Sequence, residues 1–192
     1  LIDCDPQAAS ATAVVAVDAS ETCTLADVML EPARYELADA LWETTWGFDF
    51  VPSDIHLANK ERNRTLADER TLARKLARLE DGYDVILLDC PPNLGVMTVN
   101  ALVAADRVVV VTEPNYLGLL GLSELLETVE TIREHFNAEL EVAGVVVNKH
   151  DGTREAQDSV AELAEFFAGE TGERSMVWSP RPPGLGSVEA PA

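Results

Sequence analysis

The sequence predicts an α/β fold, a three-layer sandwich in which a mostly parallel sheet is flanked by helices. Strand-like apolar runs alternate with helix-like amphipathic runs along the whole chain, and this alternation favours right-handed crossovers between parallel strands. Two of the apolar runs end in aspartate followed closely by proline, as strands do at the carboxyl edge of such a sheet. With 192 residues, 47% of them hydrophobic, the chain has material for one sizeable core and one domain.

The first half of the chain alternates between extended and helical patterns. After an opening strand, apolar residues at helical spacing between residues 25 and 41 suit two short helices. Residues 48–52 suit a short strand, and residues 65–80 suit an amphipathic helix that Gly82 ends. The buried face of that helix is expected to carry Leu72, Leu76 and Leu79.

The second half contains longer elements of the same two kinds. Apolar runs predict strands over residues 84–89, 108–112 and 142–148. The first is apolar enough to be buried on both faces, and the second is another all-apolar run. Apolar residues at helical spacing predict helices between and after these strands. These helices are expected over residues 95–105, 119–135 and 153–168, the last with Val160, Leu163, Ala164 and Phe167 facing inward.

Residues 85–92, Val-Ile-Leu-Leu-Asp-Cys-Pro-Pro, carry the strongest functional signal. A buried parallel strand would bring Asp89 out at the edge where such sheets bind ligands, and the two prolines then end the strand because they have no N–H to donate. This pattern is typical of the Walker B magnesium site of nucleotide hydrolases. The alternative is a buried strand whose Asp89 only caps the following helix.

The opening residues, Leu-Ile-Asp-Cys-Asp-Pro-Gln, repeat this order of apolar, acidic and proline residues. Together with residues 84–106 they resemble the ParA/MinD family of deviant-Walker ATPases, whose members carry D-x-D-P-Q after one strand and D-x-P-P after the next. The resemblance continues through the loop Glu113-Pro114-Asn115-Tyr116 and the helix over residues 119–132, and covers about residues 1–150. D-P-Q, the segment over residues 96–106 and the E-P-N-Y loop favour the chromosome- or plasmid-partitioning branch.

The resemblance implies a function and a set of site residues. It implies an ATPase that binds ATP with magnesium, forms a homodimer when ATP is bound, is regulated by a ParB-like protein and positions a cargo such as DNA. Asp89 would hold the magnesium through a water ligand, Asp5 would position or polarise the attacking water, and Asp3 would lie near the metal. For Asp3 a cap or loop hydrogen bond is the alternative. Asn148 and Pro180 would contact the nucleotide.

One family element is absent from the sequence: the strand and K-G-G-x-G-K-T phosphate loop with which members open. We therefore expect residues 1–178 to be an incomplete nucleotide-hydrolase domain that lacks its first strand, and residues 179–192 to be an irregular Pro/Gly-rich tail that stops short. Such a fragment should bind little nucleotide alone and be inactive, because the loop's N–H groups and lysine hold the phosphates. Whether this chain is an enzyme is left open, and the rival is a loop-less, non-catalytic interaction module.

Asn148-Lys149-His150-Asp151 also fits N-K-x-D, the guanine-reading signature of many GTPases. Asn and Asp are common at strand ends for reasons of turn chemistry alone. A GTPase would usually carry D-x-x-G where this chain has Asp89-Cys90-Pro91-Pro92, so the sequence favours ATP over GTP.

Composition narrows the setting. The net charge of −20 comes with few lysines and with acidic residues spread along the chain, which favours a halophilic source over an acidic patch built for a basic partner. Three cysteines without C-x-x-C spacing argue against a disulfide framework or zinc site and favour a reducing cytoplasm, and no apolar run is long enough for a membrane span. DNA binding is weakly supported, because residues 151–192 contain only three arginines.

Overall fold

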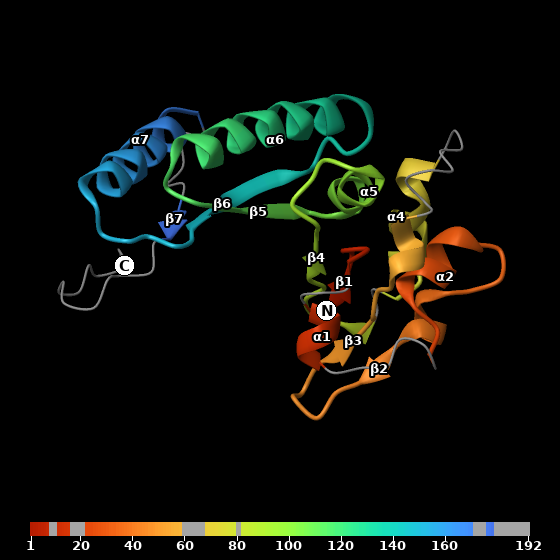
Figure 1. Ribbon diagram of the computed structural model, residues 1–192. Coiled ribbons are helices and arrows are strands. Elements are labelled where there is room, and N and C mark those ends of the chain that lie inside the picture. Colours follow the sequence, from red (N-terminus) through yellow and green to blue (C-terminus); the bar gives the residue numbers. More distant parts are fainter. Residues whose placement is uncertain (8–10, 16–21, 59–67, 80–81, 171–175, 179–192) are drawn as a thin grey trace. The chain divides into compact units, whose positions relative to one another are not determined.

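The computed structural model describes residues 1–7, 11–15, 22–58, 68–79, 82–170 and 176–178 (Figure 1). These residues form two compact units, each with its own hydrophobic core. Unit 1 comprises Leu1–Ala105 and Glu134–Ala138, and unit 2 comprises Asp106–Arg133 and Glu139–Ala192. The expected single domain over residues 1–178 stays a prediction, and the expected tail, residues 179–192, lies outside the described residues.

Unit 1 is built around two short parallel strands, β1 (Ile2–Asp3) and β4 (Leu88–Asp89). Their register pairs Ile2 with Leu88 and Asp3 with Asp89, and a parallel bridge joins Ile2 to Val51 on the other side of β1. A short antiparallel hairpin, β2 (Trp42–Glu43) with β3 (Asp49–Phe50), lies in the same unit. The expected strand over residues 48–52 is therefore found, whereas its antiparallel partner β2 was not predicted.

Short helices surround the strands of unit 1. The two helices expected between residues 25 and 41 are present, one as an α-helix and one as a 3-10 helix. Leu25, Met29, Leu72 and Met97 are fully buried in one core with Ile2 of β1. The helices are α1 (Ala11–Val15), α2 (Leu25–Leu30), α4 (Thr71–Leu76) and α5 (Val96–Ala104), and the 3-10 helices are η1 (Leu37–Ala40), η2 (Ile55–Leu57) and η3 (Asp68–Arg70).

The prediction of a strand over residues 84–89 buried on both faces is wrong. Only Leu88–Asp89 is strand, and Val85 and Leu87 are 72% and 62% exposed. The physical reason is that alternate side chains of an extended segment face opposite sides. Ile86 and Leu88 pack against the core of unit 1, whereas Val85 and Leu87 face the side that the described residues leave exposed.

Unit 2 is a three-stranded parallel sheet in the order β5-β6-β7, formed by β5 (Arg107–Thr112), β6 (Glu141–Val147) and β7 (Met176–Trp178). Helices α6 (Tyr116–His135) and α7 (Arg154–Glu170) lie along this sheet (Figure 1). Leu122 of α6 and Leu163 of α7 share one buried cluster with Val110, Val145 and Val147, so both helices cover the same face.

The strand predicted over residues 108–112 is present as β5, but one of its faces is exposed. Val109 and Val111 are 49% and 64% exposed, although the run is all apolar. Both described helices of unit 2 pack against the side that carries Val110, which leaves the alternate side chains of the strand uncovered. The class itself, α/β with mostly parallel strands, is confirmed, with the strands falling into three hydrogen-bonded groups in the part of the chain that is described.

Two helix predictions need adjustment. In the segment expected as a helix over residues 65–80, the described part is η3 followed by α4, with Leu72 and Leu76 buried and Leu79 partly buried as expected. In α7, Leu163 is buried and Val160 packs against it, but Ala164 is exposed, because it lies outside the stripe that faces the sheet. The side chain of Phe167 lies outside the described residues. No helix among the described residues has the length and apolar content to cross a lipid bilayer.

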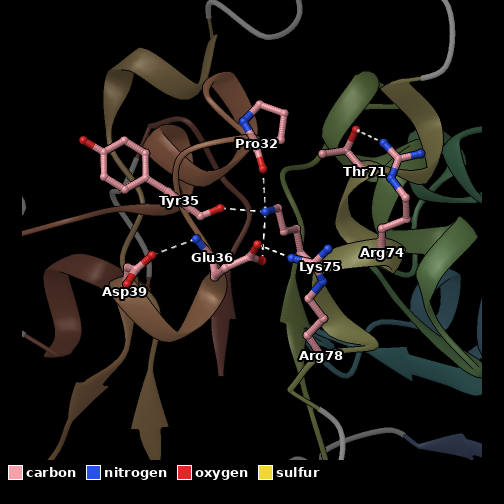
Figure 2. Close-up of polar contacts among 8 residues, drawn as sticks. All are labelled: Pro32, Tyr35, Glu36, Asp39, Thr71, Arg74, Lys75 and Arg78. Carbon is pink, nitrogen blue, oxygen red and sulfur yellow. Dashed lines mark hydrogen bonds and ion pairs between the residues drawn. The ribbon is translucent and has the colours of Figure 1, made fainter.

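A buried lysine ties the turn after α2 to helix α4 (Figure 2). Lys75 is 5% exposed, and its Nζ donates to the carbonyl oxygens of Pro32 at 2.7 Å and Tyr35 at 2.6 Å. It also pairs with Glu36 Oε2 at 2.8 Å, while Arg78 pairs with the other oxygen of Glu36. The charge of Lys75 is therefore matched on three sides, as a buried ammonium requires.

Candidate functional site

The carboxyl ends of β1 and β4 form the candidate site of unit 1. Asp3 and Asp89 are register partners on these parallel strands, and the backbone N–H of Cys4 donates to the carbonyl oxygen of Asp89 at 2.8 Å. Asp5 follows two residues after Asp3, so it emerges at the same edge as Asp89. The two aspartate-tipped strands predicted from the sequence are thus neighbours, with their acidic ends on one side.

Asp3 is fully buried and has hydrogen bonds to both of its carboxylate oxygens. Oδ2 accepts from Thr12 twice, from the backbone N–H at 2.8 Å and from Oγ1 at 2.6 Å, and Oδ1 accepts from the N–H of Asp5 at 3.0 Å. Thr12 Oγ1 in turn accepts from the backbone N–H of Ser53 at 3.0 Å. This is the geometry of the loop hydrogen-bond alternative, and it leaves Asp3 poorly placed to give an oxygen to a metal ion.

Asp5 and Asp89 are the carboxylates at this edge that remain partly accessible. Asp5 Oδ1 accepts from the N–H of Gln7 at 2.8 Å, which orients the side chain without burying it. Within the described residues, no three His, Cys, Asp or Glu side chains gather closely enough to hold a metal ion. Two carboxylates still fit Mg²⁺, because that cation keeps several waters and is commonly held by one or two carboxylates plus the phosphates of a nucleotide.

Two cysteines directly follow the paired aspartates, Cys4 after Asp3 and Cys90 after Asp89. Cys4 is fully buried and Cys90 is exposed. The neighbouring Cys90 thiol, together with burial, raises the pKa of Cys4 well above that of a free thiol, and the neighbouring Cys4 thiol lowers the pKa of Cys90. Cys23 is remote in sequence and half-buried, and burial, with the nearby Asp27 and Asp39 charges, raises its pKa to about 11.

The carboxyl ends of β5 and β6 form a second polar edge, in unit 2. The N–H of Asn148 donates to the carbonyl oxygen of Thr112 at 2.7 Å, which ties the two strand ends together. Lys149 then pairs with Glu113 at 2.5 Å, and both side chains are largely exposed. Asn115 links this edge to α6, because its Oδ1 accepts from the N–H of Gly118 at 2.8 Å and its Nδ2 donates to Glu113 at 3.2 Å.

The N-K-x-D segment is arranged as a turn. Asn148 Oδ1 accepts from the N–H of Lys149 at 2.9 Å, and Lys149 has a left-handed backbone with φ of 53°. Asp151 Oδ1 accepts from the N–H of Thr153 at 3.0 Å and from its Oγ1 at 2.7 Å, and these bonds lower the pKa of Asp151. The carboxylate that would read guanine is engaged at the start of α7, which favours turn chemistry over a guanine-specific role.

Comparison with known proteins adds to this geometry. The sequence profile of the AAA domain family matches residues 1–142. The Bacillus subtilis sporulation initiation inhibitor protein Soj is 35% identical, over 87% of this chain and 67% of its own length, and the Thermus thermophilus chromosome-partitioning ATPase Soj is 34% identical, over 100% of this chain and 72% of its own. The chain belongs to the ParA/MinD family of P-loop ATPases.

A solved structure agrees with the family assignment. Cobyrinic acid a,c-diamide synthase from Mycobacterium smegmatis, with bound ATP analogue and magnesium, superimposes with a TM-score of 0.77 at 30% identity. The match covers 85% of this chain and 68% of the synthase chain. The chain spans about half the length, 54%, of the first curated relatives that it matches.

The predicted site residues of this ParA/MinD-family chain fall into separate parts of the molecule. Asp3, Asp5 and Asp89 come together at the edge of unit 1, Asn148 is exposed at the edge of unit 2, and Pro180 lies outside the described residues. The sequence did not single out Thr12, the partner of Asp3, because a threonine in a run of small residues gives no periodic signal. Asn115 was quoted only as part of a motif, although its position one residue before α6 is a helix-capping signal.

Proposed function

We propose that this chain carries the metal-holding and water-positioning carboxylates of a partitioning-type ATPase. In the complete protein, ATP with magnesium would bind at the β1/β4 edge, and hydrolysis would reset a nucleotide-dependent homodimer that positions a cargo. The proposal is supported by family membership and by relatives that are named as a chromosome-partitioning ATPase or solved with an ATP analogue and magnesium.

The observation that carries the proposal is the parallel register of Asp3 with Asp89. It brings Asp5 and Asp89 to one edge, where both side chains are partly accessible. Magnesium supplies charge neutralisation of the phosphates when bound. We assign Asp89 to hold the ion through a water ligand and Asp5 to accept a hydrogen bond from the attacking water and orient it.

Asp3 takes a positioning role in this proposal. Its bonds to Thr12 and to the N–H of Asp5 hold the turn from which Asp5 projects. A metal-contacting role for Asp3, the original expectation, is not favoured by these bonds. A role in nucleotide binding for Asn148 and Pro180 stays a prediction.

Partners and setting are proposals of the same kind. A homodimer on ATP and a ParB-like regulator follow from the partitioning branch. DNA is the least supported cargo contact, since the chain carries a net charge of −20 and phosphate binding needs a basic surface. A cytoplasmic location and a halophilic source also stay predictions.

The deciding experiment measures magnesium-dependent ATP hydrolysis by a protein in which the family's glycine-lysine phosphate loop has been joined ahead of this chain. Asp89→Asn and Asp5→Asn should each lower kcat by about 10²-fold or more, because each removes a charge that acts on the metal or the water. Asp84→Asn is the matched control, since Asp84 is an exposed aspartate at the other end of the same segment. Equal activity of Asp89→Asn and Asp84→Asn would overturn the proposal.

Two further measurements bear on the rivals. The 192-residue chain alone should show no magnesium-dependent turnover, and measurable turnover would contradict the expectation that it needs a phosphate loop. In competition on the loop-containing protein, ATP should displace GTP, because Asp151 is engaged with Thr153. If that protein binds no nucleotide at all, the loop-less interaction module becomes the better explanation.

A further inference from the structure

Cys4 and Cys90 are neighbours through the pairing of β1 with β4. They directly follow the register partners Asp3 and Asp89, and the N–H of Cys4 bonds the carbonyl oxygen of Asp89 at 2.8 Å. Residues level with one another on adjacent parallel strands point to the same side, about 4.8 Å apart. That spacing lies within the range of about 4.4–6.8 Å between the Cα atoms of a disulfide.

The two thiols differ in access. Cys90 is exposed, whereas Cys4 is fully buried in the core beside Ile2 and Met97. A small oxidant can therefore reach Cys90 first, and Cys4 is the cysteine that the pairing of β1 with β4 brings next to it. An accessible cysteine with a second one nearby is the arrangement found in reversible thiol oxidation sites.

We propose that Cys90 and Cys4 form an oxidation site at which a hydroperoxide converts the two thiols into a disulfide. In the first step the Cys90 sulfur attacks one oxygen of hydrogen peroxide and the O–O bond breaks. Cys90 becomes a sulfenic acid, and the other oxygen leaves as water after taking up the thiol proton. In the second step the Cys4 sulfur attacks the Cys90 sulfur, the S–O bond breaks, and a second water leaves. Two electrons pass from the thiols to the peroxide, and a thiol reductant reverses the change.

The consequence for catalysis rests on the proposed function. Each cysteine is the sequence neighbour of a carboxylate at the site, Cys90 of Asp89 and Cys4 of both Asp3 and Asp5. A covalent bond between the two strand ends would redirect these backbone segments and slow hydrolysis by the complete protein. Oxidation would then switch off the ATPase until the disulfide is reduced.

The test uses the 192-residue chain and hydrogen peroxide, with free thiols blocked before non-reducing digestion and mass spectrometry. Cleavage after glutamate separates Cys4 from Cys23 at Glu21 and leaves Cys90 on a third peptide. The expected product is a Cys4–Cys90 linked pair that lacks two hydrogen atoms, while Cys23 remains available to the blocking reagent. Cys23→Ser should form the same product.

Two controls keep the result decisive. In Cys4→Ser, Cys90 should accumulate as sulfenic acid and react with dimedone, because no resolving thiol remains. In denaturant the preference should disappear and Cys23 should join the mixture of products. Oxidation of Cys23 as fast as Cys90 in the folded chain, or overoxidation of Cys90 without the linked pair, would overturn the proposal. Because the readout is mass, its failure leaves the proposed ATPase untouched, and an inactive ATPase leaves the thiol site untouched.

Discussion

The two units keep their charged groups in different surroundings. In unit 1, Asp3 is fully buried and Lys75 is 5% exposed, and both are matched by internal hydrogen bonds. In unit 2, the ion pairs Glu113–Lys149 and Arg107–Glu141 are largely exposed. Burying a charged group costs much free energy unless hydrogen-bond or ion-pair partners compensate it. The members of an exposed pair are solvated by water whether or not they are paired. Unit 1 therefore fixes its loops through charges, and unit 2 fixes its sheet chiefly through apolar packing.

The largest effect is expected at Asp3. Asp3→Ala should lower the free energy of unfolding by about 3 kcal/mol, because it leaves two buried donors of Thr12 and the part-buried N–H of Asp5 without an acceptor. Asp3→Asn keeps one oxygen acceptor and should lose less. Denaturant unfolding checks this, with exposed Asp84→Ala as the control at under about 0.5 kcal/mol. Equal losses for Asp3→Ala and Asp84→Ala would show that the burial of Asp3 has no energetic weight.

Lys75 should come next, with a direct comparison in the other unit. Lys75→Met should cost about 2 kcal/mol, because the carbonyl oxygens of Pro32 and Tyr35 lose their donor. Part of the penalty is relieved because Glu36 is partly exposed and keeps Arg78. Lys149→Met, the same substitution at an exposed pair, should cost clearly less. If the two urea midpoints shift equally, the contrast between the units fails.

The packing of unit 2 can be tested with two glycines of α6. A Cβ at Gly118 would lie 2.2 Å from the carbonyl oxygen of Glu113, whereas a Cβ at Gly121 would meet nothing within 4 Å. Gly118→Ala should therefore destabilise the protein by about 1–3 kcal/mol through backbone displacement. Gly121→Ala should stabilise it by up to about 1 kcal/mol through helix propensity. Thermal unfolding of the two variants gives the signs, and a stabilised Gly118→Ala would refute the close approach.

The smallest effect is expected for the Glu113–Lys149 pair, and it should depend on pH and salt. The pair lowers the pKa of Glu113 and raises the pKa of Lys149. Its stabilisation is therefore present above the ordinary glutamate pKa and lost as pH falls through the lowered value, and at the alkaline end it is lost as pH rises through the raised lysine value. Glu113→Gln should remove both the acidic and the alkaline part of this pH dependence, measured as the free energy of unfolding against pH. In 1 M NaCl the pH dependence of stability of the wild-type protein should approach that of the variant, because salt screens an exposed ion pair. A difference between the two proteins that does not change with salt would contradict this explanation.

The sequence predicted the elements whose periodicity is long and whose ends carry turn residues. The helices α5, α6 and α7 and the strands β5 and β6 agree closely with expectation, because each consists of a long run whose apolar residues recur at the spacing of its element or fill it. The hairpin of β2 and β3 was missed in part, since two-residue strands leave no alternation to detect. The exposure of Val85 and Val109 could not be foreseen, because an apolar run shows which residues suit a sheet but not whether neighbours cover it.

The candidate site was predictable only at the level of motifs. The order apolar, aspartate, proline located Asp3, Asp5 and Asp89, and the register of β1 and β4 agrees with a shared edge. The same motifs could not distinguish the buried, hydrogen-bonded Asp3 from the accessible Asp5, because the distinction depends on Thr12, nine residues away from Asp3. The proximity of Cys4 and Cys90 likewise depends on strand pairing, which neither motif alone reveals.

The uncovered valines of β5 bear on how copies of this chain behave in solution. Val109 and Val111 offer an apolar stripe to other molecules, while a net charge of −20 keeps those molecules apart at low ionic strength. The Debye length falls from about 10 Å at 0.1 M salt to about 3 Å at 1 M. High salt therefore screens the electrostatic repulsion between copies of the chain, while the apolar attraction through the exposed valines remains. The intensity of light scattered by the purified 192-residue chain should therefore increase with added NaCl as the chains associate. Replacing both valines with threonine should reduce that increase.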